Sequence, residues 1–171
     1  MNLGGIASTK NMGAALSLTP MGQAEQTGAA AAAVTSQPIN QVPFGPQQHE
    51  SAVFVFTGTW TAPAAQTITL ALVVQHADDN GSGAPGTFAA APADSQPQAN
   101  KVLTGVAAAA PIALRYDLRI SELKKFVRLV LTPSYSDASV TSAINLSMLG
   151  ILGGASNVVT RTVDWTPNYK S

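Results

Sequence analysis

The chain has 171 residues, enough for one domain with a hydrophobic core and additional segments. Nine Lys and Arg balance nine Asp and Glu, so the formal net charge is zero, and charged residues make up only 11% of the chain, against roughly 25% in typical soluble domains. The missing basic excess argues against a nucleic-acid binder that neutralises phosphates. The absence of cysteine excludes disulfides and thiolate metal sites.

Residues 1–50 form the first distinct segment. They carry only Lys10, Glu25 and Glu50 as charges and show no hydrophobic period. A segment of Gly, Ala, Ser, Thr, Gln and Pro buries too little apolar surface to offset an ordering entropy of roughly 1–2 kcal/mol per residue. We therefore expect an extended N-terminal arm that is held along its own domain or across neighbouring subunits.

The arm shows no pattern of a secretory signal, because polar residues and Pro20 interrupt any apolar run after Lys10. The alanine run at 29–33 is far shorter than the roughly 20 residues that span a bilayer, so we expect no membrane partner. Three apolar arm residues lie among prolines, which lower the cost of an extended conformation. We predict that these three, Ile39, Val42 and Phe44, bind a partner.

From Ser51 onward the sequence is typical of short strands separated by turn residues, as in an all-β fold. The apolar run Ala52–Phe56 and the alternating run Ile68–Val74 predict two strands of a hairpin, with Gly58–Ala65 between them. Residues 77–100 then predict a long loop rich in Ala, Pro, Gly, Asp and Gln. Loops of this length usually bind a partner, so this loop is a second candidate contact element.

The second half of the domain continues the alternation. We expect strands over 101–106, 112–118, 126–131 and 140–149, with Pro133 ending the third of these. The larger apolar side chains of each alternating run share one face and predict the core. The domain boundaries that follow are an arm over 1–50, an antiparallel β-sandwich over 51–155 and a short polar C-terminal tail over 156–171.

Motifs for chemistry do not find the context they need. Gly81, Gly83 and Gly86 match the letters of a dinucleotide fingerprint, but prolines around them prevent the helix that the motif requires. The step from Asn80 to Gly81 predicts a tight turn. The two histidines, His49 and His76, have no cysteine beside them to complete a zinc site. We expect no enzyme, no cofactor and no metal.

Basic residues cluster in one part of the sequence. Five of the nine lie between positions 115 and 128, with two acidic residues among them. The five are Arg115, Arg119, Lys124, Lys125 and Arg128. Two interpretations are open: a solvated face, or a patch that binds an acidic protein surface, for which Arg115, Arg119, Lys124 and Lys125 are the candidate residues. Aromatic residues for base stacking are not interleaved, so nucleic acid is not the expected partner.

Tyr116-Asp117-Leu118, the run from Leu123 to Leu129, Thr132-Pro133 and the glycine-rich Gly150–Gly154 together resemble the C-terminal half of small virion proteins of tailed bacteriophages. These are the capsid decoration or cement proteins. The resemblance implies a jelly-roll-like domain that binds the outside of a lattice of major capsid protein, often as a trimer. It implies a location on the capsid surface after synthesis in the host bacterial cytoplasm.

Two other classes of protein share these sequence features. A phage tail, fibre or head-to-tail connector component has the same low-charge, β-rich composition. A carbohydrate-binding β-sandwich module is the second alternative, with Trp60, Tyr135 or Trp165 as a platform for a sugar ring.

Overall fold

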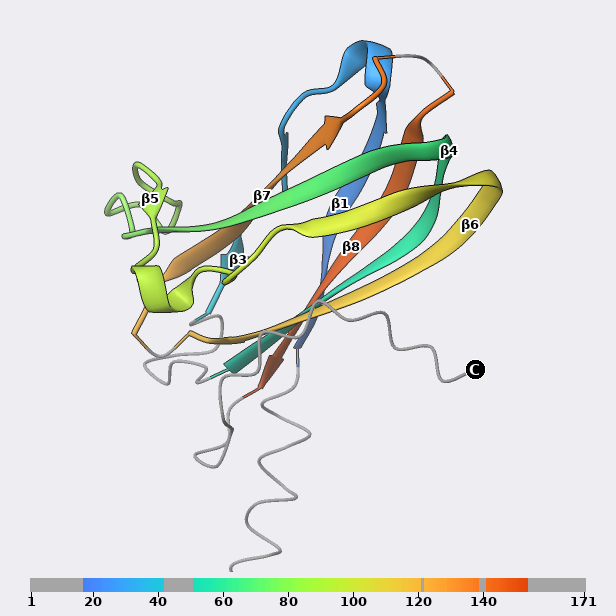
Figure 1. Cartoon of the computed structure of the whole chain (residues 1–171). Helices are drawn as coiled ribbons and strands as arrows, with labels where there is room; N and C mark the ends of the chain where they lie inside the picture. The colour runs from blue at the N-terminus through green and yellow to red at the C-terminus, as the bar shows by residue number, and fades with distance from the viewer. Residues whose placement is uncertain (1–16, 42–50, 121, 139–140, 154–171) are drawn as a thin grey trace, which may run out of the picture.

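The computed structural model describes residues 17–41, 51–120, 122–138 and 141–153. Its strands form one eight-stranded sheet in which all strand pairings of the described residues are antiparallel, and the predicted all-β, jelly-roll-like fold class is confirmed (Figure 1). The strands are β1 (Ser17–Thr27), β2 (Val34–Thr35), β3 (Ile39–Asn40), β4 (Ser51–Ala77), β5 (Ala89–Ala90), β6 (Lys101–Arg119), β7 (Phe126–Tyr135) and β8 (Ala143–Gly153). Two 3-10 turns, η1 (Gly28–Ala30) and η2 (Ala93–Ser95), lie between them.

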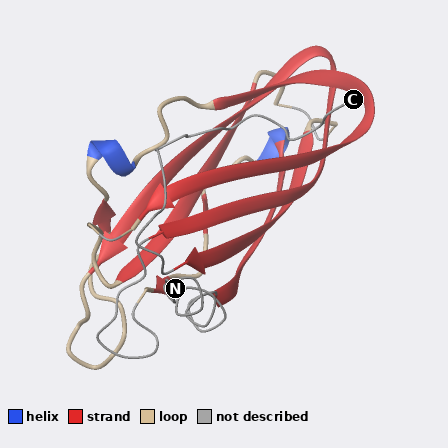
Figure 2. Ribbon diagram, turned by 90° about the horizontal axis from the view of Figure 1, so that it is seen from below, coloured by secondary structure: helices blue, strands red, loops and turns tan. Residues whose placement is uncertain are grey.

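Strands β4 and β6 bend, and each contributes to two layers of the fold. The first part of β4, residues 51–60, pairs with residues 110–119 of β6 and with β8. The second part, residues 68–77, pairs with β7, and its beginning pairs with residues 101–103 of β6. Both ribbons turn back at the same end of the molecule (Figures 1 and 2). One continuous sheet therefore folds over itself into a sandwich.

The bend corrects one expectation from the sequence. The runs at 52–56 and 68–74 do not pair with each other as a hairpin, because they are two parts of one bent strand. Ala65 adopts a positive φ of 65° at the corner. A Cβ at Gly105 would overlap the backbone carbonyl oxygen of Pro63, so β6 passes this close to β4 only with glycine at that position.

The core lies between the two layers and follows the predicted alternation. Phe54 and Phe56 of β4 are buried, and Phe54 stacks on Tyr116 of β6 with ring centroids 6.2 Å apart. The other layer contributes Leu70 and Leu129, both fully buried. Aromatic and branched side chains thus fill the interior, and their burial is the main source of stability.

Part of the N-terminal segment is paired with the sheet. Strand β1 pairs with β8 along its length, from Ser17 opposite Leu152 to Thr27 opposite Ala143. Strands β2 and β3 pair with β7. Residues 17–41 therefore belong to the same folded body as residues 51–153, so this part of the expected arm lies along its own domain. Their backbone groups are satisfied by the sheet, so their low apolar content does not prevent ordering.

Residues 1–16, 42–50 and 154–171 lie outside the described residues, and with them the expected tail over 156–171. In the part of the chain that the structure describes, no helix is long and apolar enough to cross a membrane.

Candidate interaction surface

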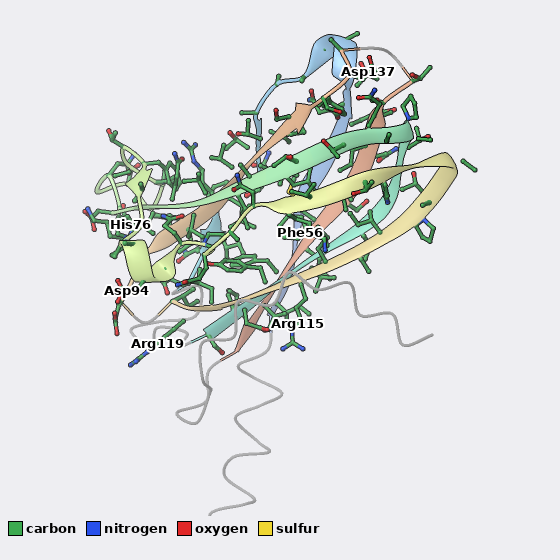
Figure 3. All side chains as sticks on the ribbon, in the orientation of Figure 1. Phe56, His76, Asp94, Arg115, Arg119 and Asp137 are labelled. Carbon is green, nitrogen blue, oxygen red and sulfur yellow. The ribbon has the colours of Figure 1, made fainter. Side chains whose placement is uncertain are left out.

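The four basic residues predicted to bind a partner each lie beside a carboxylate of the same chain. Figure 3 shows Arg115 and Arg119 projecting outward from β6, whereas Phe56 points into the interior. The pairs are Arg115 with Asp117 at 2.7 Å, Arg119 with Glu122 at 3.6 Å, Lys124 with Asp78 at 2.6 Å, and Lys125 with Asp79. The structure brings Lys124 and Lys125 together with the 77–100 loop, and their charge is balanced there.

Much of the 77–100 loop is held by its own domain. The side chain of Gln96 accepts a hydrogen bond from the Val74 backbone N–H at 2.9 Å and donates to the Val74 carbonyl oxygen at 2.8 Å. The Gln96 side chain therefore satisfies the backbone N–H and carbonyl of Val74 in β4, as a further strand would. The hydroxyl of Tyr116 donates to the Ser95 carbonyl oxygen at 2.8 Å. The loop needs no partner to hold these positions.

Arg128, the fifth residue of the basic cluster, also makes contacts within the chain. Its guanidinium lies over the ring of Phe88, 3.9 Å from the centroid. Its Nε donates to the Gln75 side-chain oxygen at 2.8 Å. The cation–π contact covers one face of the guanidinium and fixes Phe88 against β7.

Hydrogen bonds from two sides hold the turn before β7, at Leu123 and Lys124. The buried amide of Gln41 donates to the carbonyl oxygens of Leu123, at 2.9 Å, and Lys124. From the other side, Nδ1 of His76 accepts from the Lys124 backbone N–H at 3.4 Å. Burial of the ring, together with the positive charge of Lys124, lowers the pKa of His76 below its usual value.

The apolar anchors predicted in the arm have different outcomes. Ile39 is 2% exposed and belongs to this chain's own core, so it is not a free anchor for a partner. Its burial follows from the pairing of β3 with β7, which sequence periodicity does not reveal because β3 spans only Ile39–Asn40. Val42 and Phe44 lie outside the described residues.

Neither aromatic platform that lies among the described residues is fully exposed. Trp60 is 9% exposed and lies in the core. Tyr135 is half-buried and packs against that core. Trp165 lies outside the described residues. Stacking on a sugar requires an exposed ring face, which the indole of Trp60 does not offer.

One surface that the sequence analysis did not single out is the outer face of the layer formed by β6, β4, β7 and β2. The register shows which side chains share this face. Thr69 of β4, for example, lies opposite Val102 of β6 on one side and opposite Ser134 of β7 on the other. We name it the threonine-valine face. Its members are Thr35, Thr67, Thr69, Ala71, Val73, Val102, Thr104, Val130, Thr132 and Ser134.

The ten side chains of the threonine-valine face are uncharged, and the same row of β7 continues to Arg128. The ten include the two large apolar side chains that are most exposed among the described residues. Val102 is 53% exposed and Val73 is 37% exposed. The signal in the sequence is the row of Thr67, Thr69, Ala71 and Val73, which alternates with the core residues of β4. A strand with one buried face normally carries polar residues on the other, so Ala71 and Val73 are the members of this row that depart from the pattern.

Comparisons with known proteins identify no family for this chain. No family model and no curated protein matches the chain. Among solved structures, the chain is similar to one described as the structure of infectious bursal disease virus Gx strain, with 13% sequence identity and a TM-score of 0.43. The alignment covers 84% of this chain and 34% of the viral chain, so this chain spans about a third of its length.

Proposed function

We propose that this chain is a structural protein of a virus particle, and specifically a decoration protein that binds the outer surface of a bacteriophage capsid. The observation that supports the proposal best is the threonine-valine face, a broad uncharged sheet surface with Val73 and Val102 exposed. Exposed apolar side chains on a polar sheet face are compatible with a protein contact.

The composition of this face suits contact with another protein. Burying a charged group costs several kcal/mol unless it is paired, whereas covering valine is favourable and a threonine hydroxyl needs only a hydrogen-bond partner when it is covered. The four cations of the basic cluster are less suited, because each lies beside a carboxylate of the same chain. We therefore place the capsid contact on the threonine-valine face.

A repeated lattice makes a modest contact sufficient. Each copy of the chain gains little from one such face, but oligomers that contact several capsid subunits at once bind far more tightly than one copy does. A homotrimer at a threefold position of the major capsid protein is the assembly we propose. The role is structural rather than catalytic.

Reconstitution on particles tests this function. Capsids that lack the protein are mixed with wild-type chain, with Val102→Glu or with Val73→Glu, and bound copies are counted by co-sedimentation and by electron cryo-microscopy. We expect each glutamate to weaken binding by about tenfold or more, because its charge is buried without a partner. Thr57→Glu is the matched control, since Thr57 is exposed on the outer face of the other layer.

Equal occupancy for Val102→Glu and Thr57→Glu would exclude the threonine-valine face as the contact. Density for the protein on the tail instead of the capsid would favour the tail, fibre or connector alternative.

A further inference from the structure

The loop after β4 contains the one Asn-Gly step of the chain, Asn80-Gly81. Both residues are exposed, and Gly81 has a positive φ of 90°. Apart from its two chain neighbours, no residue lies within 4 Å of where a Cβ would stand at Gly81, so no distant part of the chain crowds this step. Asparagine side chains in such turns undergo attack by the following backbone nitrogen, and glycine offers the least steric hindrance to that attack.

The attacking nitrogen is hydrogen-bonded to a carboxylate. The N–H of Gly81 donates to Oδ1 of Asp79 at 2.8 Å, and the N–H of Gly83 donates to the same oxygen at 2.9 Å. The other oxygen of Asp79 pairs with Lys125. The Lys125 contact and the Gly83 N–H lower the pKa of Asp79, so its carboxylate is ionised near neutral pH. The Asp79 carboxylate thus accepts a hydrogen bond from the proton that the Gly81 nitrogen must lose.

The carbonyl under attack is held by two donors. Oδ1 of Asn80 accepts from the Ser82 backbone N–H at 2.9 Å and from the Ser82 hydroxyl at 2.7 Å. This oxygen gains negative charge when the side-chain carbon becomes tetrahedral. Two donors already aimed at that oxygen stabilise the charge, as in the oxyanion hole of an acyl-transfer enzyme.

From this arrangement we propose that Asn80 is a self-modification site, at which the loop promotes conversion of its own asparagine to aspartate and isoaspartate. The bond from the Gly81 nitrogen to the Asn80 side-chain carbon forms, and the bond from that carbon to Nδ2 breaks. The amide proton of Gly81 leaves with Nδ2 as ammonia, which gives a succinimide. Water then opens the ring at either carbonyl and yields aspartate or isoaspartate.

The reaction adds a carboxylate where two are already paired. Asp78 and Asp79 hold Lys124 and Lys125, which fasten this loop to the turn before β7. A third negative charge at position 80 has no cation of its own among these contacts, and isoaspartate also lengthens the backbone by one carbon. The modification therefore weakens the contact between the loop and the turn before β7. This inference does not depend on the proposed function.

Peptide mapping of the full chain tests the proposal. The protein is incubated in mildly alkaline buffer, and mass spectrometry follows the conversion of each asparagine, with isoaspartate distinguished by enzymatic methylation. Asn100 and Asn145 are internal controls, because both are exposed and neither precedes glycine. We expect Asn80 to convert at least about tenfold faster than either control.

Two comparisons separate the folded loop from the bare sequence. We expect Asn80 to convert faster in the native chain than in the same chain unfolded in urea, and Ser82→Ala to slow the native reaction roughly fivefold by removing one donor. Asp79→Ala slows it as well, whereas Lys125→Gln leaves the Asp79 acceptor in place and has a smaller effect. A native rate equal to or below the unfolded rate would overturn the proposal, and so would an unchanged rate in Ser82→Ala.

Discussion

The hydroxyl of Tyr116 donates a hydrogen bond to the carbonyl oxygen of Ser95, and this bond of 2.8 Å ties the 77–100 loop to β6. Tyr135 provides the contrast, since its hydroxyl is buried without a hydrogen-bond partner in the described part of the chain. Two tyrosines of one core thus differ in whether the hydroxyl is satisfied.

Replacing the two tyrosines should have opposite effects on stability. Tyr116→Phe keeps the ring stacked on Phe54 but leaves the Ser95 carbonyl oxygen without this donor, so we expect the free energy of unfolding to fall by about 1–2 kcal/mol. Tyr135→Phe removes an unsatisfied polar atom and should leave stability unchanged or raise it. Urea denaturation of both variants measures the difference, and a larger loss in Tyr135→Phe would contradict the assignment.

Alkaline pH should act through the buried hydroxyl of Tyr135. Burial raises the pKa of Tyr135 to about 12, above the value of about 10 for an exposed tyrosine. The folded state holds this proton more tightly, so its contribution to stability is complete below about pH 10 and is lost as pH rises through about 12. Tyr135→Phe should reduce the fall in stability across that window, as measured by denaturation at stepped pH, and the remaining fall comes from Tyr116, whose pKa is also raised by burial.

Mild acid should act through His76, whose pKa is lowered by burial and by Lys124. The neutral ring accepts the Lys124 N–H, so this contribution is present above the unfolded pKa of about 6.5 and is lost as pH falls below it. His76→Asn offers an acceptor that does not titrate. We expect that variant to lose less stability than wild type between neutral pH and mild acid, and an identical pH dependence would contradict this role.

Truncation separates the two parts of the N-terminal segment. Deleting residues 1–48 removes β1, β2 and β3, exposes the edge of β8 and takes Ile39 out of the core. We expect an aggregated or strongly destabilised protein, in contrast to the folded domain that a simple arm predicts. Deleting residues 1–16 keeps every described strand and is the control. Equal thermal stability of the two truncated proteins would contradict the role of β1.

Gly58 should tolerate no side chain. A Cβ at this position would overlap the backbone carbonyl oxygen of Asn145, across the pairing of β4 with β8. Gly58→Ala must therefore separate two central strands, and we expect a loss of about 2–4 kcal/mol in the free energy of unfolding. Thr57→Ala, at an exposed neighbour on the same strand, is the control and should cost far less.

The sequence predicted the elements whose side chains alternate strictly. The rows through Tyr116, Leu129 and Leu146 were assigned to the core, and all three residues are buried. Such rows can be predicted because side chains alternate between the two faces of a strand. When one face packs on the core, every second residue is therefore buried.

The sequence left the placement of the arm and of the basic cluster open, because the environment of both depends on residues far away in the chain. Ile39 is buried by the pairing of β3 with β7, and Lys124 is paired with Asp78, which lies 46 residues before it. Neither relationship leaves a local pattern in the sequence.

The sequence alone therefore determined the β class, the alternating core rows and the low charge, since these depend on composition and on the geometry of one strand. Only the tertiary structure decided that β4 bends into both layers, that residues 17–41 complete the sheet and that the row beside Val73 forms an uncharged outer face. Strand pairing and ion pairing join segments that are distant in sequence, and the free energy of these contacts appears only when the chain has folded.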